Sequence, residues 1–385
     1  MMAETRSVYI VAAERSGDLL GAGLVRALRE QAGDRIQLAG VGGQALSAEG
    51  IESAVDIAGL SILGFFDGLK SLGLLKRKVA DTVADILRVK PDMVVLIDSW
   101  GFMLRVAQGV RAADPSIQLV KYVGPQVFAT RPGRARTLAH TVDHLMTILS
   151  FDAPYYEPHG LPVTFVGNPT LDRMPTGDGP SFRQRHGLAA DQDVLLVLLG
   201  SRSSEIRRLW PSFEGAVRRL LSHRENLQPV FLVAEPVRDL LLPKLQEGGW
   251  LHVGEDEKAD AFAAADMALA CSGTVVTELA TVGVPTVTGY RLGWLTWAIM
   301  RGLRVMKAPF ISLVNIAAGR LLVPEFVQTQ CRPGPLAGAV EALLDDPQRR
   351  ASLQTELMAA TRELRGEGDA SRRAAETVLG LLDPR

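Results

Sequence analysis

The chain has 385 residues, and at about 150 residues per domain this length predicts two or three domains. Apolar residues make up 47% of the chain and charged residues 22%, which describes a globular protein. The formal net charge of -1 gives no sign of nucleic-acid binding, so no nucleic-acid partner is expected.

The first part of the chain alternates short apolar runs with amphipathic stretches. It passes from Met1 through a polar stretch into the first strand, without the basic and then apolar leader of an exported protein. We predict strands over residues 8–13, 36–41, 93–98, 118–123, 145–149 and 163–166. Helical patterns fill the intervals, and strands that alternate with helices imply a parallel sheet covered on both faces.

A cluster of breaker residues then interrupts this pattern. Residues 172–180 contain Pro175, Gly177, Gly179 and Pro180, which predict a linker. The alternation then restarts, with strands predicted over residues 194–199, 230–234, 250–253, 267–270 and 286–288. From Pro335 onward the pattern is helical and rich in Ala, Leu, Arg and Glu.

These patterns predict an α/β protein with two doubly wound domains that face each other across a cleft. Ligands are expected at the carboxyl ends of the strands. The first domain is expected over residues 1–171, the linker over 172–180 and the second domain over 181–334. A helical tail, residues 335–385, is expected to pack back on the first domain.

The most informative stretch follows the strand predicted at 267–270. Ser272, Gly273 and Thr274 form a small-residue turn, and we expect Ser272 to cap the next helix. The free amides at this helix start favour an anion. Glu278 shares a helix face with Thr274, where its carboxylate can accept hydrogen bonds from ribose hydroxyls. The pattern predicts a sugar-nucleotide site, and the alternative is a capped helix with an ordinary surface glutamate.

A second small-residue turn, from Gly200 to Glu205, follows the first strand of the second domain. Its small residues let the backbone approach a phosphate, and Arg202 offers a planar set of donors to the oxygens. Glu205 either orients Arg202 or favours the start of the helix. Together with the turn at Ser272, this turn predicts a phosphate site at one edge of the sheet.

Asp98 ends a predicted strand, where a carboxylate is unusual after an unbroken apolar run. Facing the cleft, it could accept a proton from an incoming hydroxyl. The alternative is that Asp98 caps the helix that starts near Gly101. We favour catalysis because of the motifs expected across the cleft.

No divalent-metal site is expected. The only Asp-x-Asp pair, Asp191 and Asp193, precedes a strand and so lies at the sheet end away from the ligand. Two cysteines, Cys271 and Cys331, are too few for a disulfide framework and lack metal-ligand spacing, which fits a reducing cytosol. The helix dipole and an arginine would stabilise a departing diphosphate without a cation or other cofactor.

Two stretches suggest contact with a lipid surface, although no charge-free apolar run of about 18 residues predicts a transmembrane helix. Residues 62–78 repeat apolar residues at helical spacing and end in a basic cluster, for which a core-facing helix is the alternative. Residues 279–324 lack acidic residues but hold tryptophans among arginines, which suits an anionic interface. The expected contacts are Phe65, Phe66, Leu69, Leu72, Lys76, Arg77, Lys78, Trp294, Trp297, Arg301 and Arg304.

The motifs resemble those of the lipid-A-disaccharide synthase family over nearly the whole chain. The similarity is closest in the second half and extends to two turns of the first half. The matching residues are Gly200-Ser201-Arg202 with Glu205, Ser272-Gly273-Thr274 with Glu278, Gly289-Tyr290-Arg291, Asn315 with Gly319-Arg320, Pro324-Glu325, Ser16-Gly17-Asp18 and Gly40-Val41-Gly42-Gly43.

The resemblance implies two Rossmann-like domains in the GT-B architecture of inverting glycosyltransferases. It implies transfer of 2,3-diacylglucosamine from its UDP derivative to 2,3-diacylglucosamine 1-phosphate, an anionic glycolipid, by a peripheral enzyme of lipid A biosynthesis. The location implied is the inner face of a Gram-negative inner membrane, with a homodimer as a possible state. Asp98 matches the proposed base, and the UDP pocket is expected to involve Arg202, Glu205, Ser272, Gly273, Thr274, Glu278, Tyr290, Arg291 and Asn315. The residues expected on the acceptor side are Ser16, Gly17, Asp18, Arg131 and Asn168.

The first half departs from the family pattern. After Asp98 only Phe102 remains of the usual Pro-x-Phe-Asn, residues 124–131 lack the usual tryptophans, and Asn168 replaces a histidine. The departures leave the acceptor open. The alternatives are an enzyme with the same donor and another acceptor, a catalytically silent lipid-binding or nucleotide-binding homologue, and a sugar-nucleotide epimerase of the same architecture.

Overall fold

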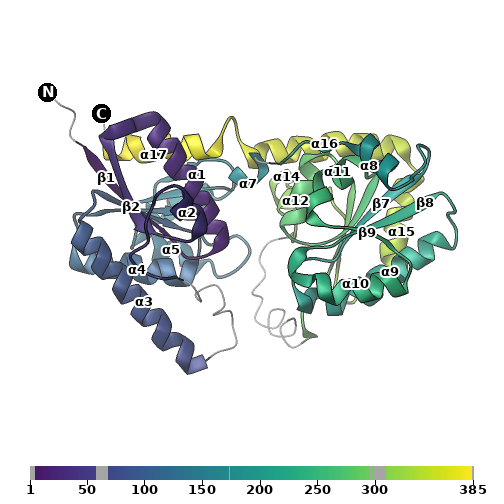
Figure 1. Ribbon diagram of the computed structural model, residues 1–385, viewed down its shortest axis with the longest axis horizontal. Helices are drawn as coiled ribbons and strands as arrows, with labels where there is room; N and C mark the ends of the chain where they lie inside the picture. The colour runs from purple at the N-terminus through teal and green to yellow at the C-terminus, as the bar shows by residue number, and fades with distance from the viewer. Residues whose placement is uncertain (1–4, 58–67, 173, 295–296, 298–308, 384–385) are drawn as a thin grey trace. The chain divides into compact units, whose positions relative to one another are not determined.

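The computed structural model describes residues 5–57, 68–172, 174–294, 297 and 309–383. The chain divides into two compact units, which we call unit 1 and unit 2 (Figure 1). Unit 1 comprises residues 1–172 and 364–385, and unit 2 comprises residues 173–363. The second crossing between the units falls within the helix α16, Pro347–Arg365.

Unit 1 is built on a parallel sheet with the strand order β2-β1-β3-β4-β5-β6. The strands are β1 Arg6–Ala12, β2 Ile36–Val41, β3 Met93–Ile97, β4 Gln118–Tyr122, β5 His144–Thr147 and β6 Val163–Phe165. The chain adds β2 on one side of β1 and β3 on the other. The order therefore reverses between β1 and β3, and the carboxyl ends of these strands form the usual ligand position of such sheets.

Helices cover both faces of the unit 1 sheet, because side chains are buried on both faces of its strands. Ile10 of β1 belongs to the apolar cluster that includes helices α1 and α17, whereas Tyr9 and Val11 belong to the cluster that includes α4. The helices are α1 Arg15–Ala32, η1 Gly33–Arg35, α2 Gln44–Ala48, α3 Gly68–Val89, α4 Trp100–Ala113, α5 Gly133–Ala139, α6 Ala153–Tyr156, η2 Glu157–His159, α7 Pro169–Asp172 and α17 Ala370–Leu382.

Unit 2 repeats this design with the strand order β12-β11-β10-β7-β8-β9, again with every pair parallel. The strands are β7 Asp193–Leu198, β8 Leu227–Leu232, β9 Leu251–Val253, β10 Met267–Cys271, β11 Thr286–Tyr290 and β12 Glu325–Val327. Here the order reverses between β7 and β10. The helices are α8 Gly179–Arg185, α9 Ser203–Leu221, η3 Glu235–Val237, α10 Arg238–Glu247, η4 Glu255–Glu257, α11 Lys258–Ala264, α12 Thr274–Thr281, α14 Leu313–Ala318, α15 Pro333–Leu344 and most of α16.

The α/β prediction with two parallel sheets and a helical C-terminal segment is confirmed, although the tail differs from expectation. Residues 335–363 belong to unit 2, where Leu336 and Val340 of α15 join the core beside α9. Only residues from 364 onward belong to unit 1, where α17 lies against α1 (Figure 1). The apolar face of α15 completes the layer begun by α9, which its composition alone did not indicate.

Candidate active site

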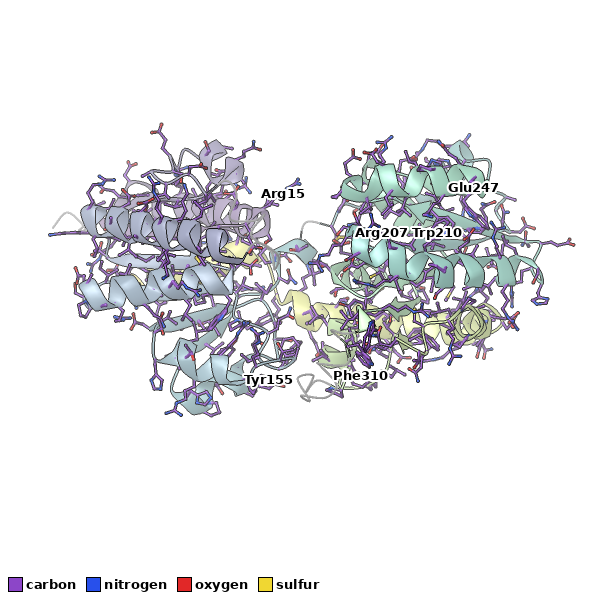
Figure 2. The ribbon with its side chains drawn as sticks, turned by 90° about the horizontal axis from the view of Figure 1, so that it is seen from below. Arg15, Tyr155, Arg207, Trp210, Glu247 and Phe310 are labelled. Atoms are coloured by element: carbon purple, nitrogen blue, oxygen red, sulfur yellow. The ribbon has the colours of Figure 1, made fainter. Side chains whose placement is uncertain are left out.

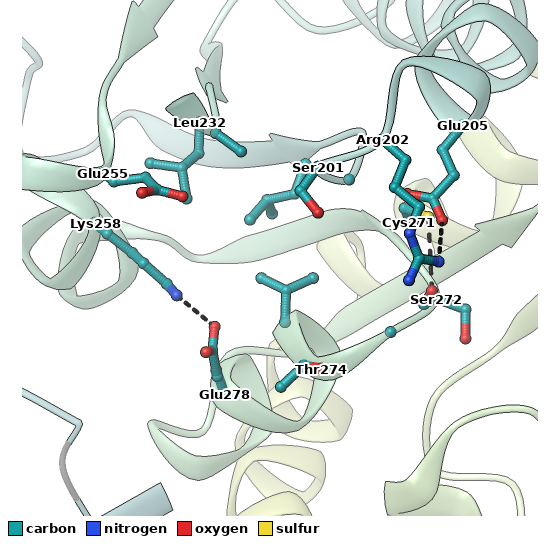
Figure 3. Close-up of a pocket in the computed structure, with 15 residues that line it drawn as sticks. Ser201, Arg202, Glu205, Leu232, Glu255, Lys258, Cys271, Ser272, Thr274 and Glu278 are labelled. Atoms are coloured by element: carbon teal, nitrogen blue, oxygen red, sulfur yellow. Dashed lines mark hydrogen bonds and ion pairs between the residues drawn. The ribbon is translucent and has the colours of Figure 1, made fainter. Parts of the chain in front are cut away.

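A pocket of about 300 Å³ lies at the carboxyl ends of β7 and β10, where the strand order of unit 2 reverses (Figure 3). It is lined by Leu198, Gly200, Ser201, Arg202, Glu205, Leu232, Ala234, Glu255, Lys258, Cys271, Ser272, Gly273, Thr274, Val275 and Glu278. Both turns predicted to hold phosphate thus border one cavity, and six of the nine predicted nucleotide-binding residues are among those that line it.

The turn after β7 presents Arg202 to this pocket. Gly200 adopts a φ of 96°, and a Cβ there would lie 2.5 Å from Glu205 Oε2, so this position requires glycine. Arg202 Nη1 lies 3.3 Å from Glu205 Oε1, and the arginine side chain is 78% exposed (Figure 3). Glu205 therefore orients Arg202, and the exposed guanidinium can bind an anion in the pocket.

The turn after β10 leads into α12, and its cap differs from the prediction. The N-cap residue is Gly273, not Ser272, whose backbone N–H donates to Gly289 O at 3.3 Å. Gly273 has no side chain that could bond the first amides of the helix, and a Cβ placed there would meet no protein atom within 4 Å. The backbone of Gly273 and Thr274 thus borders open space at the positive end of the helix.

Glu278 lies one turn further along α12 and is buried. Lys258 Nζ lies 2.6 Å from Glu278 Oε2 (Figure 3). The same ammonium lies 5.6 Å from the ring centre of Phe262. The sequence interpretation missed Lys258 and Glu255. Both residues follow Gly254 at the carboxyl end of β9, and the strand-end rule applied to this strand would have found them.

Three other predicted nucleotide-binding residues do not line the pocket. Tyr290 ends β11 half-buried, and burial raises the pKa of its hydroxyl. Burial raises the pKa of the Cys331 thiol, and the positive charge of Arg291 opposes this shift.

Asn315 is 0% exposed and holds a chain turn together. Its amide nitrogen donates to Val323 O and Glu325 Oε1, each at 2.8 Å, and its Oδ1 accepts from the backbone N–H groups of Leu322 and Val323. The donors and the acceptor of its amide are therefore used within the protein. This differs from the predicted ligand contact, because a buried amide bonded in this way organises the segment before β12.

In unit 1, Asp98 follows β3 beside the reversal between β1 and β3. Ser16 Oγ, at the start of α1, donates to Asp98 Oδ2 at 2.9 Å. Asp98 and Ser99 have φ values of 55° and 35°. The N-cap of α4 is Ser99, so Asp98 does not cap this helix as the alternative interpretation proposed.

Asp18 and Gly17, both predicted on the acceptor side, make contacts within unit 1. Asp18 is buried and accepts from the backbone N–H groups of Gly43, Ala45 and Leu46 at 2.8, 2.8 and 3.2 Å. Its carboxylate caps α2 and joins it to α1, instead of facing a ligand as predicted. Gly17 packs tightly, since a Cβ there would lie 3.3 Å from Ile97 O.

The segment 124–131 leaves the carboxyl end of β4 and is anchored by Tyr156, whose hydroxyl donates to Pro125 O at 2.6 Å. Phe128 packs edge to face on Phe151 at 5.1 Å, and its ring centre lies 6.4 Å from that of Tyr155. Tyr155 is exposed (Figure 2). Arg131 closes this segment with a φ of 51° and is exposed.

The other predicted acceptor-side residue, Asn168, lies between β6 and α7. Its Oδ1 accepts from Thr170 N at 3.1 Å, and its backbone N–H donates to Arg365 O at 3.3 Å. Asn168 therefore connects α7 to the end of α16.

The residues predicted to contact a membrane are only partly covered by the structure. Phe65, Phe66, Arg301 and Arg304 lie outside the described residues, and Leu69 and Leu72 lie in α3. Lys76 and Arg77 are exposed on α3, whereas Lys78 lies 4.0 Å from Asp56. Trp294 is 79% exposed, and Trp297 is half-buried.

Within the parts of the chain that the structure describes, no helix has both the length and the apolarity needed to span a membrane. The described residues also include no group of three or more His, Cys, Asp or Glu side chains that could hold a metal ion. Metal independence stays a prediction. Cys271 and Cys331 are both free and buried.

Comparisons with known proteins agree over the length of the chain. A family profile described as lipid-A-disaccharide synthetase matches residues 8–378. A lipid-A-disaccharide synthase of Rhodospirillum centenum is 41% identical over 389 residues, covering 98% of this chain and 95% of that protein. Another, of Paramagnetospirillum magneticum, is 37% identical and covers 97% of each chain.

Solved structures resemble the whole chain in fold. The S. aureus MnaA-UDP co-structure gives a TM-score of 0.66 at 16% identity, covering 98% of this chain and 97% of that one. A UDP-GlcNAc 2-epimerase from Neisseria meningitidis bound to UDP-GlcNAc gives 0.64 at 15% identity, covering 97% and 99%. At such identities the similarity concerns the fold alone.

Proposed function

The chain belongs to the lipid-A-disaccharide synthase family, and from this premise we propose how its two units divide the reaction. The protein is a glycosyltransferase with the GT-B architecture that acts in lipid A disaccharide synthesis. We propose that unit 2 binds the donor, UDP-2,3-diacylglucosamine. We propose that unit 1 activates the acceptor, 2,3-diacylglucosamine 1-phosphate.

The observation that carries the donor proposal is the pocket between the β7 and β10 turns. The Arg202 guanidinium offers a full positive charge to a diphosphate, and the first backbone amides of α12 offer partial positive charge. Glu278, held by Lys258, lies one helical turn away and presents carboxylate oxygens to ribose hydroxyls. A cavity of about 300 Å³ suits one nucleotide and leaves the sugar at its mouth.

The proposed chemistry is a single in-line displacement. Asp98 removes the proton of the acceptor's 6-hydroxyl while that oxygen forms a bond to the anomeric carbon of the donor. The bond from this carbon to the diphosphate oxygen breaks, and its electron pair leaves with UDP. Arg202 and the start of α12 stabilise the charge that develops on the diphosphate. Ser16 orients the Asp98 carboxylate through its hydrogen bond.

The direct test is the variant Asp98→Asn, which keeps the shape of the side chain but removes the base. Loss of general-base catalysis lowers the rate of transfer about 10²- to 10⁴-fold. UDP affinity stays unchanged, because Asp98 belongs to unit 1 and the pocket to unit 2. Products are identified by mass after incubation with UDP-diacylglucosamine and the monosaccharide phosphate. Wild-type turnover in this variant would remove Asp98 from the proposed role.

The same assay separates the alternatives. An epimerase consumes the UDP-sugar without acceptor, whereas the proposed transferase releases UDP only when acceptor is present. A silent homologue binds UDP but forms no product with any acylated glucosamine. An enzyme with another acceptor shows turnover only in an acceptor screen.

We further propose peripheral attachment to the inner face of the inner membrane and, by family analogy, a homodimer. Exposed Trp294 and the basic end of the 62–78 stretch support attachment, because aromatic and cationic side chains suit an anionic lipid surface. The proposed acceptor carries acyl chains, which places it in such a surface. Sedimentation of the purified protein tests the dimer.

A further inference from the structure

Unit 1 contains a buried lysine, Lys121. It lies near the end of β4, in the middle of the unit 1 sheet, and is only 2% exposed. Lysine is among the residues least often buried completely, because removing an ammonium from water is costly unless its charge is compensated. Its neighbours on β4, Val120 and Tyr122, are buried as well, and an apolar residue at 121 would fill the same space without this cost.

The Lys121 ammonium has a complete set of acceptors. Nζ donates to Asp98 O at 2.5 Å and to Leu96 O and Tyr122 O at 3.2 Å each. An ammonium has three hydrogens, so these three carbonyls satisfy it. Burial lowers the pKa of this amine to about 7, while the nearby Asp98 and Glu14 charges favour the protonated form.

The Asp98 and Tyr122 carbonyls lie where the backbone is strained, since Asp98 itself and Val123, directly after Tyr122, have positive φ. Asp98, Ser99 and Val123 have φ values of 55°, 35° and 69°, in the left-handed region that non-glycine residues rarely adopt. Such residues are strained and persist only where the surroundings enforce them. Two adjacent strand ends, those of β3 and β4, thus bend sharply around one cation.

We propose that Lys121 is a positioning residue for the transfer reaction: it holds the turn after β3 so that the Asp98 carboxylate faces Ser16 and the acceptor. The inference rests on the proposed role of Asp98 as the base. The carbonyl of Asp98 is bonded to Lys121 and its backbone N–H to Tyr122 O at 2.9 Å, so both backbone groups of this residue are fixed to β4. Its carboxylate is left to Ser16 and the substrate.

The experiment is a double-mutant cycle between Lys121→Met and Asp98→Asn, with transfer measured by radiolabelled donor over long incubations. In the wild-type background, Lys121→Met lowers kcat about 10- to 100-fold and leaves UDP affinity unchanged. In the Asp98→Asn background the same substitution has almost no further effect, because there is no base left to misplace. An equal loss in both backgrounds, or no loss in the wild-type background, would overturn the proposal.

The double-mutant cycle includes a control variant and a second variant of Lys121. His144→Leu serves as the matched control, because His144 is a buried polar residue of the same sheet at the amino end of β5, bonded to Thr164 Oγ1 at 2.9 Å. It lowers the melting temperature but leaves kcat unchanged. If Lys121→Met does not fold, Lys121→Gln replaces it in the double-mutant cycle, because the glutamine amide keeps two hydrogen-bond donors. Full turnover by Asp98→Asn alone would refute the base itself, separately from Lys121.

Discussion

Gly273 illustrates how single residues shape the pocket of unit 2. Its φ of 164° is extended backbone that any residue adopts, and a Cβ there meets no protein atom. Nothing in the protein's own packing therefore requires glycine. The space beside it belongs to the pocket, and we attribute the absence of a side chain to the close approach of a phosphate.

We expect Gly273→Ala to weaken UDP binding about tenfold or more while the melting temperature stays within about a degree of wild type. The added methyl group occupies the space that the diphosphate needs. Isothermal titration with UDP and a thermal melt measure the two quantities. The control is Gly338→Ala in α15, where a Cβ also meets open space. It leaves UDP affinity unchanged and stabilises the helix by about 0.5–1 kcal/mol. Equal UDP affinity in Gly273→Ala and wild type would contradict this explanation.

Single residues could be predicted where their chemistry follows from the local chain. Arg202 and Glu278 were predicted because a small-residue turn after an apolar strand identifies a strand end, and strand ends bind ligands. Both residues line the pocket, and their contact with a nucleotide stays a prediction. Asn315 and Asp18 were misassigned because their partners, the backbone amides of other segments, cannot be read from the sequence. Lys121 was missed for the same reason, since its carbonyl partners on β3 are distant in sequence.

At the scale of elements, the connection from β5 to α6 contains a titrating group. Asp152 is 1% exposed, its Oδ2 accepts from Thr147 Oγ1 at 2.5 Å, and its Oδ1 has no partner in the described structure. Burial raises the pKa of this carboxyl from 3.8 to about 7. The unfolded chain releases the proton at lower pH than the folded one. The contribution of Asp152 to stability is therefore fully present below about pH 4 and is lost as the pH rises towards 7.

We predict that Asp152→Asn removes this loss, because the amide does not ionise and its oxygen still accepts from Thr147. Relative to wild type, the variant gains stability at pH 8, where each unit of pKa shift corresponds to about 1.4 kcal/mol. Melting temperatures at pH 5 and pH 8 measure the effect. Asp34→Asn, at an exposed position, should keep the wild-type pH dependence. A pH dependence in Asp152→Asn equal to that of wild type would show that the buried carboxyl does not titrate in this range.

Most elements could be predicted because both sheets are parallel and buried on both faces, which produces unbroken apolar runs such as that of β3. The exception is β12, Glu325–Val327, which is short, half-buried and begins with a carboxylate. The Glu325 carboxylate accepts hydrogen bonds from the backbone N–H groups of Ile311 and Ser312. Long-range bonds of this kind leave no periodic signal. β8 begins at Leu227, three residues before the predicted start, because Pro229 obscured the apolar run.

At the scale of the whole molecule, membrane attachment can be tested on surface residues alone. We expect the double variant Arg77→Glu and Trp294→Ser to lower binding to vesicles containing anionic lipid, because it removes an exposed cation and an exposed indole. Co-sedimentation at low and high salt measures the loss. The exposed Arg219→Glu on α9 provides the same charge change elsewhere and should bind like wild type. Equal binding of the double variant would exclude these residues from the lipid contact.

A chain that ends at residue 363 should keep UDP binding but lose sugar transfer. It lacks α17, whose Ala374, Ala375 and Val378 belong to the apolar cluster of unit 1. Unit 1 is then destabilised, whereas the pocket of unit 2 is complete. We expect UDP binding by titration to persist and transfer to be lost. Transfer at the wild-type rate would show that unit 1 does not need its last helix.

The return of the last helix to unit 1 also affects how the protein is made. The ribosome finishes the first strands and helices early, but their apolar surface under α17 stays open until residues 173–363 have been synthesised. At about 5–20 residues per second, that delay is on the order of ten to forty seconds. During this interval nascent unit 1 exposes apolar surface that a chaperone can hold, whereas unit 2 is made from one continuous segment.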